Sequence, residues 1–194
     1  MELWSDNHAG LLCVNSCLLP NRKKNEDRIM SELEPPETHH LNAATGWLEL
    51  GNHAEAKAEL AKISPSNRRH PDVLDLVWRI LAVEKSWTEA LEVSQELVRI
   101  DPDNPSNWIH RSYSLHELKR TQEALNLLLQ VREKFPGIST ISYNLACYAC
   151  QLGDLEQARL WLAESINIRG KEEIKAVALA DPDLQPMWKE IRIL

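Results

Sequence analysis

Glycine is scarce in this sequence, and proline is no more frequent than in an average protein. The chain has six glycines and ten prolines among 194 residues, while 43% of its residues are hydrophobic and 26% are charged. These values exclude collagen-like, low-complexity and wholly disordered chains. The length suits one ordinary domain or one short array of repeats, and either can bury a core without disulfides or metals.

Positive charge is in the minority. The chain carries 29 acidic and 22 basic side chains, which gives a formal net charge of -7. A surface that binds phosphate groups would therefore lack overall electrostatic support. We expect a protein or peptide partner and no nucleic acid.

Long hydrophobic runs are also missing. The apolar run Ala9–Pro20 is interrupted by polar residues and is shorter than the ~20 residues that a membrane-spanning helix needs. Glu2 and Asp6 precede this run, and no lysine or arginine does, so the charge is wrong for a signal peptide. We expect no membrane span. Residues 1–36 are predicted to be a poorly ordered N-terminal segment, or in part an over-long start upstream of Met30.

Cysteine is too sparse for a small disulfide-stabilised fold. The chain has four cysteines, and only Cys147 and Cys150 lie in the regular part of the sequence. This usage fits a reducing compartment, so the predicted location is cytoplasmic. Their C-x-x-C spacing is that of a redox pair or half a zinc site, but no second pair accompanies it. We predict helix-packing or groove-lining cysteines, with no metal and no cofactor.

The common catalytic signatures are absent from the sequence. It has no glycine-rich phosphate loop, no H-E-x-x-H, no G-x-S-x-G and no EF-hand loop. An enzymatic alternative would use His110, His116 and Glu117 as acid–base groups. A helix does not bring the two imidazole rings onto one metal, because the histidines are six positions apart. The prediction is a protein that is not an enzyme.

The dominant pattern is an internal repeat with a period of 34 residues. A fixed period of this size predicts a solenoid of stacked structural units. A small residue at one position of each unit lets two helices approach to ~8–10 Å. Alanine recurs at this position in four successive units, at Ala56, Ala90, Ala124 and Ala158.

Each unit contains two helical patterns separated by a short turn. Apolar residues recur with helical spacing in both halves. Asn52, Ser86 and Asp154 stand where a side-chain oxygen can cap the first free N–H groups of the second helix. The expected helix pairs are 38–50 with 53–63, 71–84 with 87–100, 105–118 with 121–135, and 139–152 with 155–168.

The period, the helix pair and the signature residues together resemble the tetratricopeptide repeat. Trp108 stands at the leading tryptophan of that motif, Ala124 and Leu128 at its A-x-x-x-F pair, and Pro136 at its terminal proline. The first repeat departs most, because it lacks the leading tryptophan. The resemblance covers roughly residues 37–170 and implies an all-α, right-handed α-solenoid of about four helix-turn-helix repeats, near 37–70, 71–104, 105–138 and 139–170.

The C-terminal residues 171–194 predict a helical cap. Ile174, Leu184 and Trp188 provide apolar surface to close the last repeat, while Lys171 and Glu172 remain in water. The terminal repeats of a solenoid need a cover of this kind, with a polar outer face.

The resemblance implies a non-catalytic adaptor or scaffold that binds a peptide segment of a partner protein in a concave groove. The first helices of successive repeats line that groove in the family. A second hypothesis is a bacterial assembly or secretion chaperone that holds a client protein. The sequence identifies neither the partner nor the oligomeric state.

The exposed inner positions of the groove follow from the same resemblance. Tyr113 and Tyr143 would be amphipathic anchors, and Arg79 would contact a carboxylate. The basic two-carboxylate clamp of some family members does not match, because Asp75 and His110 stand at two of its positions. The predicted inner positions are Asn42, Thr45, Asp75, Arg79, Ile109, His110, Tyr113, His116, Tyr143, Asn144 and Cys147.

Overall fold

A computed structural model describes residues 33–194, so most of the predicted N-terminal segment lies outside the described residues. Helices fill the described part, which contains no strand. In chain order they are α2 (Glu37–Glu49), α3 (His53–Ala61), α4 (Pro71–Val83), α5 (Trp87–Ile100), α6 (Pro105–Glu117), α7 (Thr121–Val131), the short 3-10 helix η1 (Arg132–Lys134), α8 (Ser139–Gln151) and α9 (Leu155–Arg169), followed by α10 (Lys171–Ala180), the 3-10 helix η2 (Pro182–Met187) and α11 (Trp188–Ile193).

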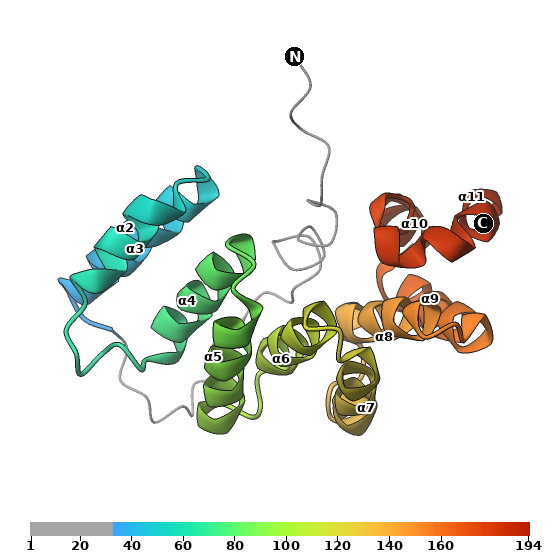
Figure 1. Ribbon diagram of the computed structural model, residues 1–194, viewed down its shortest axis with the longest axis horizontal. Helices are drawn as coiled ribbons and strands as arrows, with labels where there is room; N and C mark the ends of the chain where they lie inside the picture. Colours follow the sequence, from blue (N-terminus) through green and yellow to red (C-terminus); the bar gives the residue numbers. More distant parts are fainter. Residues whose placement is uncertain (1–32) are drawn as a thin grey trace, which may run out of the picture.

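The helices form successive pairs that stack side by side in a curved row (Figure 1). The pair α2 and α3 lies at one end of the row, and α10 and α11 lie at the other. In the middle of the row, the first helices α4 and α6 occupy one side, and the second helices α5 and α7 occupy the other. The predicted all-α solenoid is therefore confirmed.

Local chemistry accounts for the helix boundaries. Asn52 accepts a hydrogen bond from the N–H of Glu55, and Asp154 accepts one from the N–H of Gln157, as capping predicts. Ser86 makes no such bond, so its predicted capping role is wrong. The predicted helix 121–135 remains an α-helix only to Val131 and continues as the tighter 3-10 turn η1.

The turn between the two helices of each pair requires a left-handed residue. Its φ is +77° at Gly51, +57° at Lys85, +64° at Lys119 and +85° at Gly153, and these positions are 34 residues apart. Glycine adopts this conformation without a Cβ penalty, whereas an ordinary L-residue is strained there. Two of the four turns therefore carry a backbone cost.

We expect Lys119→Gly to raise the free energy of unfolding by about 0.5–1 kcal/mol, because it relieves this strain. Gly153→Ala is the reciprocal test and should lower it by about 1 kcal/mol. No atom lies within 4 Å of the Cβ that this alanine would add, so its cost is purely conformational. Urea denaturation followed by circular dichroism measures both effects. Equal stability of all three proteins would contradict the turn geometry.

The repeated alanines are completely buried. Ala56, Ala90, Ala124 and Ala158 each have 0% of their surface exposed. At the C-terminal end, the buried side chains of Ile174, Leu184 and Ile191 join the same core cluster as residues of α8 and α9. The apolar side of the last helix pair is thus covered by the segment α10–η2–α11, called the cap below.

Candidate binding surface on the first helices

The predicted groove residues lie on the four first helices, but most of them are buried. Asn42 on α2 is exposed, and Thr45 on α2 and Asp75 and Arg79 on α4 are half-buried. The predicted exposure is wrong for the others, since none of them exceeds 6% exposure. These buried residues are Ile109, His110, Tyr113 and His116 on α6 and Tyr143, Asn144 and Cys147 on α8.

The junction between α4 and α6 explains the burial of His110. Its ring stacks on the fully buried indole of Trp78, with centroids 3.7 Å apart and planes 9° from parallel. The Trp78 indole N–H donates a 3.0 Å hydrogen bond to Ser114 Oγ. His110 and Ser114 are four residues apart on one face of α6, so together they hold a single aromatic side chain of the neighbouring helix.

The junction between α6 and α8 has a similar arrangement. Here the aromatic side chain comes from α8, the first helix of the following repeat. Tyr148 of α8 stacks on His116, with ring centroids 4.9 Å apart. Its hydroxyl shares a 3.2 Å hydrogen bond with Ser112. Ser112 and His116 are again four residues apart on α6. The two histidines that the sequence placed in the groove therefore join three consecutive first helices.

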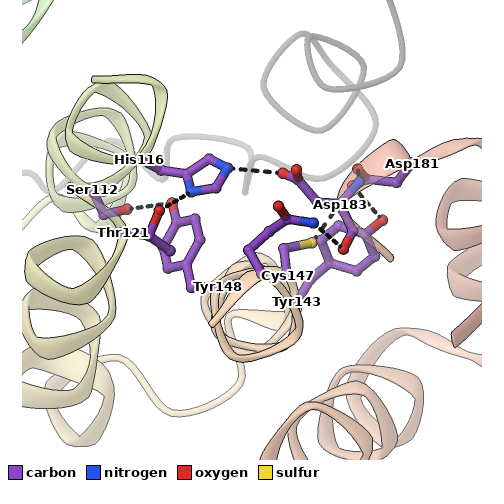
Figure 2. Close-up of polar contacts among 9 residues, drawn as sticks. Ser112, His116, Thr121, Tyr143, Cys147, Tyr148, Asp181 and Asp183 are labelled. Carbon is purple, nitrogen blue, oxygen red and sulfur yellow. Dashed lines mark hydrogen bonds and ion pairs between the residues drawn. The ribbon is translucent and has the colours of Figure 1, made fainter. Parts of the chain in front are cut away.

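The cap covers the C-terminal part of the predicted groove (Figure 2). Tyr143 Oη donates a 2.9 Å hydrogen bond to Asp181 Oδ2, and the Cys147 thiol donates to the same oxygen at 3.5 Å. His116 Nε2 lies 3.0 Å from Asp183 Oδ2, while its Nδ1 is hydrogen-bonded to Thr121 Oγ1 at 3.1 Å. Three predicted groove residues thus hold the D-P-D segment of this same chain.

Burial raises the pKa of the Asp181 carboxyl above its usual value, and the nearby charge of Asp183 adds to this effect. Hydrogen bonds from the Asp183 N–H, Tyr143 and Cys147 favour the ionised form and partly offset it. The folded protein therefore holds this proton more tightly than the unfolded chain does. Stability contributed by the protonated form is present at low pH and is lost as the pH rises through the raised pKa.

We expect Asp181→Ala to lower the free energy of unfolding at pH 7 by about 1–2 kcal/mol, because the Tyr143 hydroxyl loses its acceptor. Asp181→Asn keeps an acceptor oxygen and removes the buried charge. The stability of wild type relative to this variant should therefore fall as the pH rises above about 4. Urea titrations at pH 4, 5.5 and 7 measure this difference. A difference that is constant or that grows with pH would contradict the assignment.

The two cysteines of the C-x-x-C pair are buried, and neither forms a disulfide. Burial first, and then the charges of Asp183, Asp181 and Glu190, raises the pKa of Cys150 to about 11. This thiol is therefore protonated at neutral pH and lacks the thiolate of a redox-active pair. Within residues 33–194, no group of three or more His, Cys, Asp and Glu side chains could hold a metal ion.

On the α4 side of the surface, His110 lacks the hydrogen bonds that His116 makes on the α8 side. Asp75 Oδ1 lies 3.7 Å from His110 Nδ1, which is beyond hydrogen-bond distance. Both ring nitrogens of His110 are buried without a hydrogen-bond partner. Burial, followed by the positive charge of Arg79, lowers the pKa of His110 to about 3, so the ring is neutral at pH 7. An unsatisfied buried polar group of this kind costs about 1–3 kcal/mol.

Ile109, Tyr113 and Asn144 are not brought into one exposed site. Ile109 belongs to the main core cluster. The Tyr113 ring packs edge-to-face against Trp87 at 5.5 Å. Sequence reasoning missed Trp78, Ser112 and the aspartates of the cap. The interleaved His-x-x-x-Ser and Ser-x-x-x-His pairs of α6 are the signal that could have indicated the junctions.

Comparison with solved structures identifies the fold. MamA from Desulfovibrio magneticus RS-1, solved from residue 41 to its end, has a TM-score of 0.63 at 16% identity over 82% of this chain and 93% of its own. TTC0263 from Thermus thermophilus, described as a thermophilic TPR protein, has a TM-score of 0.62 at 16% identity over 81% of this chain and 95% of its own. The chain therefore has the fold of tetratricopeptide-repeat proteins.

No protein-family model matches this sequence, and no curated protein matches it closely enough to indicate a relative. Among residues 33–194, no helix has both the length and the apolar character that crossing a bilayer requires.

Proposed function

We propose that this chain is a non-catalytic scaffold that binds a peptide segment of a partner protein along the inner face of its first helices. The inner face means the side of α2, α4, α6 and α8 that is turned away from their paired second helices. The observation that carries the proposal is the partly exposed pair Asp75 and Arg79 on α4. These residues are four positions apart, so they lie on one face of the helix and present charges of both signs.

The proposed binding region lies toward the N-terminal half of the array. On α6 and α8, the predicted groove residues His116, Tyr143 and Cys147 are engaged in the fold, since they hold the cap. Within the proposed division into repeats 37–170 and a cap 171–194, a partner segment would therefore contact α2 and α4. The proposed location is a reducing compartment such as the cytoplasm, which suits a chain whose buried Cys147 and Cys150 are not joined in a disulfide.

Affinity capture with a charge-reversed variant tests this proposal. Wild-type protein, Arg79→Glu and Lys189→Glu are used as baits in native lysate, and the captured proteins are quantified by mass spectrometry. Lys189→Glu is the matched control, because it makes the same charge change at an exposed position of the cap. Thermal melts establish that all three baits are folded.

A partner retained by wild type and Lys189→Glu but reduced at least about tenfold by Arg79→Glu is the expected result; tenfold corresponds to ~1.4 kcal/mol of binding free energy. Equal recovery of every captured protein by the three baits would show that the inner face of α4 is not the binding surface.

A further inference from the structure

Helix α2, at one end of the row of helices, exposes apolar side chains on the side opposite its core (Figure 1). Its core side carries the buried Ala44 and Leu48. On the opposite side, Trp47 is 38% exposed and Leu50 is 77% exposed. Residues three or four positions apart share one side of a helix, so these side chains belong to one stripe. The stripe, called the end stripe below, comprises His39, Ala43, Gly46, Trp47 and Leu50.

On other first helices, the matching positions are buried against the preceding repeat. The positions 34 residues after His39 and Gly46 lie on α4 and carry a valine and an isoleucine. These side chains, Val73 and Ile80, are buried in one core cluster with residues of α2. At the equivalent position of α8, Tyr148 packs on α6 of the preceding repeat. A first helix therefore uses this side to join the repeat before it, and α2 leaves this side exposed.

The two ends of the array present different surfaces. The cap exposes the charged side chains of Lys171, Glu172 and Lys189. A terminal repeat needs a polar outer face of this kind to remain in water. The end stripe is mostly apolar and does not provide one. A second copy stacked head to tail would bury the charges of the cap, which is costly. The better match for one end stripe is therefore the end stripe of a second copy.

The end stripe is complementary to itself when two α2 helices pack antiparallel about a two-fold axis. Trp47 of each copy then meets Ala43 of the other, so a large side chain faces a small one twice. Gly46 lies between them and lets the two helices approach closely. Glu49 is exposed at the last position of α2, and it comes beside His39 at the start of the opposite helix. The carboxylate can accept a hydrogen bond from the imidazole N–H.

We propose that two copies of this chain associate through their end stripes, with α2 packed antiparallel on α2, to form a symmetric dimer. One helix face is smaller than a standard interface, so the expected Kd lies in the micromolar range. The two caps lie at the outer ends of this dimer. The proposal is independent of the proposed function, because Asn42 and Arg79 lie outside the end stripe.

Sedimentation velocity of the full-length chain over a concentration series up to about 200 μM measures the dimer directly. Trp47→Glu places a charge in the end stripe. Leu160→Glu is its matched control, because it introduces the same charge at an exposed leucine of α9. Thermal melts establish that each variant is folded.

A pair of charge variants tests the antiparallel arrangement and does not depend on Trp47. His39→Glu brings an acidic side chain beside Glu49 of the other copy. The double variant His39→Glu/Glu49→Lys restores opposite charges across the two-fold axis. The same substitutions would not compensate each other in a dimer formed through another surface.

Wild type and Leu160→Glu should dimerise with Kd values within about twofold of each other, while Trp47→Glu should raise Kd at least about tenfold, because a buried charge is left unpaired. His39→Glu should raise Kd about threefold, the scale of an exposed charge pair, and the double variant should return it to within about twofold of wild type.

A wild-type chain that stays monomeric throughout the series overturns the proposal. In that case, Leu12→Asp in the full-length chain identifies the occupant, since Leu12 lies in the apolar run outside the described residues. A dimer that appears only in this variant shows that the chain's own N-terminal segment covers the end stripe. A dimer that persists in folded Trp47→Glu places the interface elsewhere. A double variant no tighter than His39→Glu overturns the antiparallel arrangement, including when Trp47→Glu fails to fold.

Discussion

Trp78→Ala is expected to lower the free energy of unfolding by about 3–5 kcal/mol, the usual cost of removing a large buried aromatic side chain. Trp78 has 0% exposure, stacks on His110 and donates its indole N–H to Ser114. The substitution leaves a cavity between α4 and α6 and deprives the Ser114 hydroxyl of its donor. Urea unfolding followed by circular dichroism at 222 nm measures the loss.

The matched control for this substitution is Trp47→Ala. Trp47 is 38% exposed on α2, so its removal should cost clearly less than the removal of the fully buried Trp78. Similar losses for the two tryptophans would contradict the description of the α4–α6 junction. Trp78→Phe should fall between wild type and Trp78→Ala, because it keeps an aromatic ring and loses the hydrogen bond.

Ala124→Phe is expected to destabilise the protein by about 3 kcal/mol, at the upper end of the usual cost of overpacking. Ala124 has 0% exposure at one of the four equivalent positions of the 34-residue period. A phenyl ring there forces α7 away from its partner helix α6, because close approach requires a small residue. Thermal and urea unfolding would both record the loss.

Ala163→Phe is the control for the packing argument, since Ala163 is exposed on α9. This change should alter the free energy of unfolding by less than about 0.5 kcal/mol. If Ala124→Phe were as stable as Ala163→Phe, the repeated alanines would not be the contact points of the helix pairs.

The fold could be predicted from the sequence because its signals are local and are repeated four times. The eight α-helices from α2 to α9 begin within one residue of their predicted starts. Apolar spacing, the capping residues Asn52 and Asp154, and the recurring alanine all act within a single 34-residue unit. The two wrong predictions about helix ends are also local. Ser86 is the N-cap residue of α5 but its side chain makes no capping hydrogen bond, and α7 ends early and continues as a 3-10 turn.

The candidate site was harder to predict, because exposure depends on which distant segment covers a position. The resemblance placed His116 and Tyr143 in an open groove, as in a generic repeat. In this chain, Asp183 and Asp181 cover them from 67 and 38 residues away in the sequence. His110 is likewise fixed by Trp78 of the preceding repeat. Such contacts depend on the path of the cap and on how neighbouring repeats stack. The sequence of a single 34-residue repeat specifies neither.

Site-specific photo-crosslinking tests most directly the central claim that a partner lies along the inner face of the first helices. A benzophenone amino acid replaces Asn42 on α2 or, as the matched position, Asn126 on α7, and both asparagines are exposed. After irradiation in native lysate, the account predicts a partner adduct from position 42 and none from position 126. An adduct formed from position 126 alone, or equally from both positions, would contradict it.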